Sequence, residues 1–121
     1  MKNKITAVVG VSVNPEKFGY KIFDGLIKSG YKVFAVGVKG GQLFAEKIYA
    51  NLADLPCKPD IVITVVPPAA TEKTVDDCID LGIKEIWMQP GSNSEKAAQK
   101  ARAAGIKVTT DACFMKANKI W

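Results

Sequence analysis

A glycine-containing segment follows the first apolar run of the chain and combines several groups that bind anions. Gly10 permits a tight turn, Ser12 and Asn14 offer hydrogen-bond donors, and Lys17 adds a positive charge. Gly19 would let the backbone approach closely where a helix begins. Because the first N–H groups of a helix lack an acceptor within it and lie at the positive end of its dipole, this segment predicts a phosphate cradle. The alternative is an ordinary glycine-containing turn between a strand and a helix.

The spacing of these residues narrows the kind of phosphate ligand. The dinucleotide fingerprint G-x-G-x-x-G fails, because Ser12 stands where its second glycine belongs and Pro15 where its third belongs. No acid follows the second apolar run to bind a ribose 2′-hydroxyl. Lys39 stands near there and suits a phosphate on the ribose. NAD is therefore disfavoured as the ligand, whereas NADP and a phosphorylated adenosine stay compatible with the sequence. The alternative for Lys39 is an ordinary surface lysine that binds no ligand. The Walker pattern is also absent, so no motif in the sequence supports hydrolysis of a nucleoside triphosphate.

Two later turns also follow apolar runs and would lie at the same edge of a parallel sheet. Val66 and Pro67 would form an apolar wall for an adenine ring, and Gln89, Pro90 and Gly91 would close the pocket from the next loop. The alternative is that the prolines only terminate strands.

The residue types that are missing exclude several classes of site. The chain has no histidine, which excludes a Ser-His-Asp relay and an imidazole metal ligand. Arg102 is its single arginine, so bidentate guanidinium clamps are scarce. Cys57, Cys78 and Cys113 are odd in number and form no CxxC pair, which argues against a disulfide framework and a zinc site. We therefore expect no metal.

The excess of positive charge is spread along the chain. Seventeen Lys and Arg residues stand against 12 Asp and Glu residues, which gives a formal charge of +5. No basic run is interleaved with aromatic residues, so we expect no nucleic-acid partner. No apolar run approaches the roughly 18 residues of a membrane helix, so we expect no membrane partner and a cytoplasmic location.

Five apolar runs rich in β-branched residues alternate with segments of helical spacing. They are continuous, as in strands that are buried on both faces of a parallel sheet, and cover residues 5–9, 32–36, 61–66, 85–88 and 106–109. Gly30 and Gly82 would terminate the first two helices, and Gly105 the last. The last helix would begin with a capping box from Ser92 to Glu95. A short helical turn that ends at Pro56 is expected within residues 49–56. The pattern predicts one α/β domain over residues 1–121, doubly wound, with about five parallel strands.

The chain resembles the small CoA-binding domain family in the order and spacing of its motifs. This family is related to the CoA-binding domains of succinyl-CoA synthetase alpha subunits and of NDP-forming acyl-CoA synthetases. The matching segments start with Ala7 to Ser12, Pro15, Lys17, Gly19 and Tyr20, and continue through residues 30–33, 49–56, 60–62, 82–91, 104–108 and 111–113. The resemblance covers essentially the whole chain and implies a Rossmann-like three-layer fold.

The resemblance also implies roles for individual residues. The loop that holds the CoA diphosphate would comprise Ser12, Val13, Asn14, Lys17 and Gly19, and Lys39 would contact the nucleotide end. Val66, Pro67 and Pro68 would lie against the adenine, and Gln89, Pro90 and Gly91 would line the other side of the groove. This chain departs from the family where Gly37 and Val38 replace a common proline, and where Ala112 replaces a common arginine.

The resemblance implies binding of CoA or an acyl-CoA without catalysis. Synthetase relatives use a phosphorylated histidine on a separate domain, and this chain has no histidine. We expect a carrier, a sensor, or a subunit that works with another protein or as a homo-oligomer. A small NADP-dependent oxidoreductase and an interaction protein with a decayed nucleotide site are the alternatives. Cys113 is expected to be structural, although a redox role beside a CoA thiol stays open.

Overall fold

The sheet at the centre of the molecule is built largely from the predicted apolar runs. The computed structural model describes residues 3–121. Four parallel strands form its middle: β1 (Ile5–Val9), β2 (Lys32–Val36), β5 (Ile61–Thr64) and β6 (Glu85–Met88). The strand β7 (Lys107–Thr109) extends it beyond β6, and the order is β3-β4-β2-β1-β5-β6-β7. The predicted doubly wound α/β fold is confirmed.

The other edge of the sheet differs from the prediction. The strands β3 (Gln42–Leu43) and β4 (Glu46–Tyr49) form an antiparallel hairpin, and β4 pairs in parallel with β2. Residues 3–121 therefore form seven strands where about five were expected. The expected helical turn is shorter, a 3₁₀ turn labelled η1 (Leu52–Asp54). Only Ile48 is buried in β4, so this strand lacks the continuous apolar run that marks the others.

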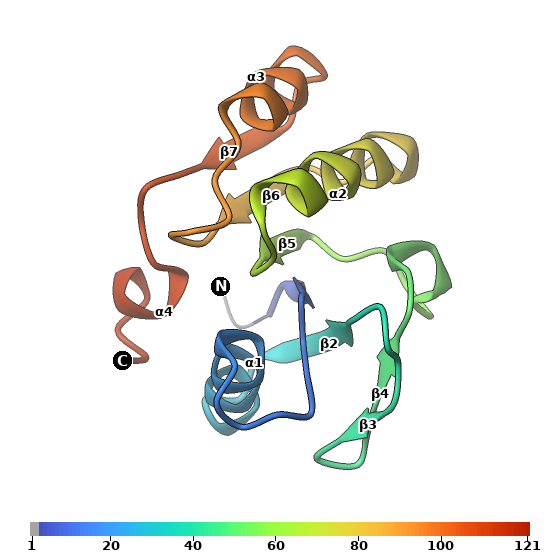
Figure 1. Ribbon diagram of the computed structural model, residues 1–121, viewed down its shortest axis with the longest axis vertical. Helices are drawn as coiled ribbons and strands as arrows, with labels where there is room; N and C mark the ends of the chain where they lie inside the picture. The colour runs from blue at the N-terminus through green and yellow to red at the C-terminus, as the bar shows by residue number, and fades with distance from the viewer. Residues whose placement is uncertain (1–2) are drawn as a thin grey trace.

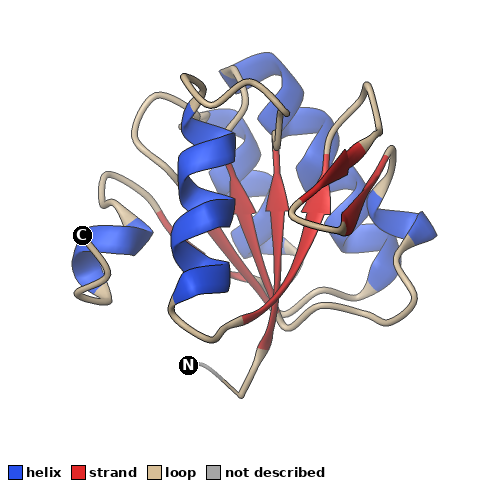
Figure 2. Ribbon diagram, turned by 90° about the horizontal axis from the view of Figure 1, so that it is seen from below, coloured by secondary structure: helices blue, strands red, loops and turns tan. Residues whose placement is uncertain are grey.

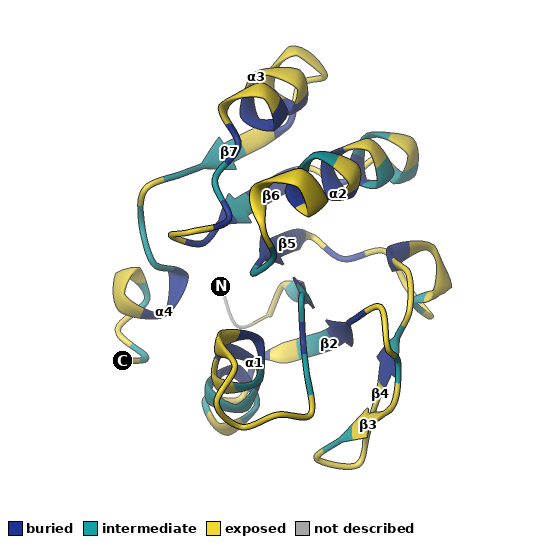
Figure 3. Ribbon diagram, viewed as in Figure 1, coloured by how far each residue is buried: buried dark blue, intermediate teal, exposed yellow. Residues whose placement is uncertain are grey.

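Helices cover both faces of the sheet and give three layers (Figures 1 and 2). One face packs against α1 (Phe18–Lys28) and α4 (Phe114–Ala117), and the other against α2 (Pro68–Leu81) and α3 (Glu95–Ala103). Side chains alternate between the two cores: Ala7 and Val62 face the α2 side, whereas Val8 and Ile63 face the α1 side. Figure 3 shows the inward faces of the helices buried and their outward faces exposed.

The ends of the helices follow the expected signals with one correction. Gly82 ends α2 in the left-handed conformation, and Gly30 and Gly105, just after α1 and α3, also have positive φ. The cap of α3 is Ser94, whose Oγ accepts from the N–H of Ala97 at 3.1 Å, so the predicted cap at Ser92 is wrong. Ser92 is buried, and its hydroxyl lies 2.8 Å from that of Thr64 and ties β5 to the turn after β6.

Candidate functional site

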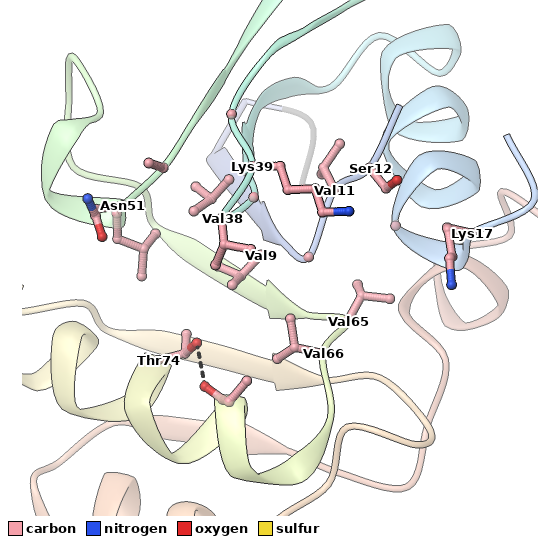
Figure 4. A pocket seen from close by; sticks show the side chains of 18 of the residues that line it. Val9, Val11, Ser12, Lys17, Val38, Lys39, Asn51, Val65, Val66 and Thr74 are labelled. Carbon is pink, nitrogen blue, oxygen red and sulfur yellow. Dashed lines mark hydrogen bonds between the residues drawn. The ribbon is translucent and has the colours of Figure 1, made fainter. Parts of the chain in front are cut away.

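A cavity of about 630 Å³ opens beyond the carboxyl ends of β1, β2 and β5. Here β1 lies between β2 on one side and β5 on the other, so the connections that leave neighbouring strands diverge to opposite faces and leave a crevice. Its volume lies in the range of small-molecule sites. Figure 4 shows side chains from the loops after β1 and β2, from η1, from residues 65–67 and from α2 around it.

Three glycines let the segments around this cavity meet at close range. A Cβ at Gly10 would lie 2.4 Å from the carbonyl oxygen of Val65, and one at Gly19 would lie 2.0 Å from that of Gly10. At Gly37 it would lie 2.3 Å from the carbonyl oxygen of Val11. Gly10 also has a φ of +114°, which other residues rarely adopt. The segment after β1 can therefore lie directly against Val65, the start of α1 and the segment after β2 only because these three positions lack side chains.

The loop after β1 is held by its own polar side chains. The Oγ of Ser12 accepts from the N–H of Asn14 at 3.1 Å, and the Oδ1 of Asn14 accepts from the N–H of Glu16 at 3.0 Å. These bonds use acceptor atoms, so the hydroxyl hydrogen of Ser12 and the amide NH₂ of Asn14 stay available as donors. The loop thus keeps the donors that the sequence analysis assigned to it.

The start of α1 presents unpaired backbone donors beside this loop. Lys17 is the N-cap residue, and no side chain caps the helix. Within residues 3–121, the N–H groups of Phe18, Gly19 and Tyr20 have no protein acceptor, and the same holds for Ser12 and Val13 in the loop. Unpaired N–H groups at the positive end of a helix favour an anion.

Charged side chains reach the cavity from three segments. Lys17 and Lys39 are exposed and come from separate loops, as Figure 4 shows, and Lys73 comes from α2. Asp77 is the one acid among the described lining residues, and its Oδ2 lies 3.3 Å from the Nζ of Lys73. The lining therefore carries an excess of positive charge, which suits a ligand with several phosphates.

The cavity brings together most of the residues that the sequence analysis selected. Those that line it are Gly10, Ser12, Val13, Asn14, Lys17, Gly19, Lys39, Val66 and Pro67. The selected residues outside the lining are Tyr20, Pro68, Gln89, Pro90 and Gly91. Contact of any of these residues with a ligand stays a prediction.

The residues outside the lining have other partners or positions. Tyr20 packs edge-on against Phe44, with ring centroids 5.2 Å apart, and Pro68 is the first residue of α2. Gln89 is only 5% exposed; its Oε1 accepts from the N–H of Phe114 at 2.6 Å, and its Nε2 donates to the Sγ of Cys113 at 3.3 Å. Its amide is therefore bonded to the segment that begins α4.

Some lining residues were missed by the sequence analysis. Three of them follow β4: Ala50, Asn51 and Leu52. Three others lie on α2: Lys73, Thr74 and Asp77. Phe18, at the start of α1, also lines the cavity and is 64% exposed. The residues after β4 reach the cavity because β4 runs parallel to β2 and ends at the same edge of the sheet. Recognition of β4 in the sequence would have found them.

The cysteines are free and lie in three different environments. Cys57 is exposed, Cys78 is buried, and Cys113 is partly buried. Burial raises the pKa of the Cys78 thiol to about 12, and the charge of Asp77 adds to this. Partial burial opposes ionisation of Cys113, but hydrogen bonds from Gln89, Lys116 and Met115 outweigh it and lower the pKa of this thiol.

Two absences hold for the described part of the chain. Among residues 3–121, no group of three or more Cys, Asp or Glu side chains is placed to hold a metal ion. None of the helices found there has both the length and the apolar character needed to cross a membrane.

Comparison with known proteins identifies the family. Residues 4–119 match the family described as CoA binding domain. The chain is 33% identical to the alpha subunit of the ADP-forming acetate–CoA ligase I of Pyrococcus furiosus, over 87% of this chain and 26% of that subunit. It therefore spans about a quarter of the length of that relative.

Solved structures give the same result for the fold. A conserved hypothetical protein of Pyrococcus furiosus has a TM-score of 0.89 at 30% identity, over 94% of this chain and 98% of that one. The apo dinucleotide-forming acetyl-coenzyme A synthetase 1 of Ca. Korarchaeum cryptofilum has a TM-score of 0.78 at 28% identity, over 87% of this chain and 25% of that one. The predicted resemblance is confirmed: the chain has a Rossmann-like α/β fold and belongs to the CoA-binding domain family.

Proposed function

We propose that this protein binds CoA or an acyl-CoA in the cavity beyond β1, β2 and β5, as a non-catalytic carrier or sensor module. The observation that carries the proposal is the group of unpaired N–H donors at the start of α1 and in the adjoining loop, which open into a lysine-rich cavity. CoA is a polyanion with a diphosphate and a ribose phosphate, so it needs several separate anion sites along one groove.

The residues present fit the parts of such a ligand. The N–H groups of Ser12, Val13 and Gly19 would hold the diphosphate, and Lys39 would hold the phosphate on the ribose. Val66 and Leu52 offer apolar surface for the adenine. When bound, CoA supplies a thiol that can form a thioester. The role of the protein would be to hold the nucleotide end of CoA and to leave its thiol end accessible.

The lack of a catalytic constellation supports a binding role. The chain has no histidine, and Asp77 is the only acid among the described residues that line the cavity. The aligned part covers only 26% of the alpha subunit of acetate–CoA ligase I of Pyrococcus furiosus and 18% of that of ligase II, so ligase activity is not extended to this chain. We propose a cytoplasmic location, because its three cysteines are free. A protein partner or a second copy would act on the thiol end.

Lys39 also favours a second candidate, a small NADP-dependent oxidoreductase, because NADP likewise carries a phosphate on its adenosine ribose. The two functions differ in the ligand that they require. NADP carries a nicotinamide on the far side of its diphosphate, whereas CoA carries a flexible chain.

Calorimetric titration with CoA, dephospho-CoA, NADP and ATP separates these functions. We expect CoA to bind most tightly and dephospho-CoA more weakly, because the latter lacks the ribose phosphate. Heat with NADP and none with CoA would overturn the proposal in favour of the oxidoreductase. No heat with any of the four ligands would indicate an interaction protein with a decayed site.

A further inference from the structure

Asp77 is out of place in a cavity suited to a polyanion. The other charged residues of the described lining are Lys17, Lys39 and Lys73. A carboxylate near phosphates weakens their binding, because like charges repel. Its presence therefore calls for a part of the ligand that a carboxylate attracts.

Asp77 lies in the third turn of α2 and is one of the residues that line the cavity. Its Oδ2 pairs with the Nζ of Lys73 one turn earlier, at 3.3 Å, and the side chain of Asp77 is 38% exposed against 74% for Lys73. The side chain of Asp77 is thus the less exposed of the two. The pair leaves Oδ1 of Asp77 free to accept a hydrogen bond.

Other polar side chains at this end donate hydrogen bonds within the protein and offer acceptor oxygens. The hydroxyl of Thr74 donates to the carbonyl oxygen of Ala70 at 3.0 Å, as the dashed line in Figure 4 shows. The amide of Asn51 donates to the Oδ2 of Asp54 at 3.2 Å. Both residues line the cavity and keep an acceptor oxygen. This end therefore offers acceptors to a ligand that donates.

The surrounding surface is apolar and suits a flat ring. Val9, Leu52, Val66 and Ala70 line the cavity. Leu52 follows Asn51 and begins η1, and Ala70 is hydrogen-bonded to Thr74 on α2. The phosphate donors lie at the opposite side, at the start of α1. A nucleotide with its diphosphate at those donors would place its base in the apolar end.

We infer that Asp77 is a specificity-determining residue, whose carboxylate accepts a hydrogen bond from the exocyclic amine of an adenine base. This inference rests on the proposed function. Adenine is a flat apolar ring whose amine is its hydrogen-bond donor, so it matches a carboxylate in an apolar slot. A base without the amine would cover the free Oδ1 of Asp77 without giving it a hydrogen-bond donor, which costs affinity.

The test compares two ligands that differ only in the amine. They are adenosine 3′,5′-bisphosphate and purine riboside 3′,5′-bisphosphate, titrated calorimetrically into the whole chain and into Asp77→Ala. In the unmodified protein, loss of the amine should weaken binding roughly ten-fold, as for a hydrogen bond to a charged group. In Asp77→Ala the two ligands should bind within about two-fold of each other, because the partner of the amine is gone.

Asp80→Ala is the matched control. Asp80 is an exposed acid on the same helix and does not line the cavity, so its loss removes the same charge and should keep the ten-fold ratio. Asp77→Ala removes only a solvent-exposed ion pair, so we expect it to fold, which circular dichroism checks. Asp77→Asn provides a second variant that keeps the shape of the side chain and should reduce the ratio.

Each outcome decides the inference. The role of Asp77 is overturned if the unmodified protein binds the two bisphosphates with equal affinity. It is also overturned if both Asp77 variants keep the ten-fold difference in affinity. In either case the proposed binding of CoA is unaffected. Absence of binding by CoA and by both bisphosphates overturns the proposed function and the inference together.

Discussion

Lys17 and Lys39 have the same charge but border different parts of the cavity, so their replacement should have different effects. Lys17 precedes the first turn of α1, beside the expected diphosphate, whereas Lys39 follows β2. We predict that Lys39→Ala lowers the affinity for CoA roughly ten-fold and hardly changes the affinity for dephospho-CoA, because only CoA carries the ribose phosphate. Lys17→Ala should weaken both ligands alike. Calorimetric titration measures all four affinities.

Lys21→Ala is the control for these variants, because Lys21 is exposed on α1 and does not line the cavity. It removes one positive charge from the same side of the molecule and should change neither affinity by more than about two-fold. If Lys17→Ala and Lys39→Ala reduce the CoA and dephospho-CoA affinities to the same extent, the assignment of Lys39 to the ribose phosphate is wrong.

Cys78 should make the protein less stable in alkaline solution. Burial and Asp77 raise the pKa of its thiol from 9.0 to about 12, so above pH 9 the unfolded chain loses this proton and the folded chain keeps it. The free energy of unfolding should then fall by about 2 kcal/mol between about pH 8.5 and about pH 10.5 on account of this group. Urea denaturation over this range measures the fall.

The contribution of Cys78 is isolated by the difference from Cys78→Ala. This variant lacks the thiol, so its stability should decline less steeply, and the advantage of the unmodified protein should shrink as the pH rises. Parallel pH profiles for the two proteins would show that burial of the thiol does not control this loss.

At the level of elements, prediction succeeded where strands are buried on both faces. Such strands are continuous apolar runs, and the first, second and fourth runs match β1, β2 and β6. It failed at β4, because this strand of four residues between β2 and β3 has one buried side chain and leaves no such run. It also put the cap of α3 at Ser92, since a serine at either position gives a similar pattern and only the packing shows that Ser92 is buried.

The candidate site was predictable to the same degree. The loop after β1 carries its chemistry in consecutive residues, so Ser12 and Lys17 were found. Asn51 follows the missed strand β4 and Asp77 lies in the third turn of α2, and only the fold brings them to the cavity. A turn after a strand gives no sign of which way its side chains point: Gln89 is buried against Cys113, outside the lining of the cavity, and its contact with a ligand stays a prediction.

The contact between α1 and the loop after β1 should depend on Gly19. This residue has an ordinary φ, so only the lack of space, with a Cβ 2.0 Å from the carbonyl oxygen of Gly10, requires a glycine there. We predict that Gly19→Ala lowers the free energy of unfolding by about 1–3 kcal/mol, as overpacking does, despite the better helix propensity of alanine. It should also lower CoA affinity by moving the N–H donors. Urea denaturation and titration measure the two effects.

Lys21→Ala again serves as control, since it puts an alanine on the same helix at an exposed position and should leave the stability within about 0.5 kcal/mol. A Gly19→Ala variant as stable as this control would contradict the close approach of helix and loop.

At the scale of the whole molecule, the cavity joins the two layers of helices. The start of α1 packs on one face of the sheet and α2 on the other, and both line the same crevice beyond β1. A ligand in this crevice would contact α1, which packs on one core, and α2, which packs on the other. Binding should therefore stabilise the fold as a unit and not one layer alone.

Thermal unfolding tests this coupling together with the prediction of a single domain. Because the two cores share one sheet, we expect a single cooperative transition by calorimetry, both with and without ligand. CoA at a hundred times its Kd should add about 2.7 kcal/mol to the free energy of unfolding and move that one transition upwards. NADP at the same concentration should move it less. Gly19→Ala should lose most of the shift, because its donors no longer meet the diphosphate. Two separate transitions, of which CoA moves one, would show that the layers unfold independently.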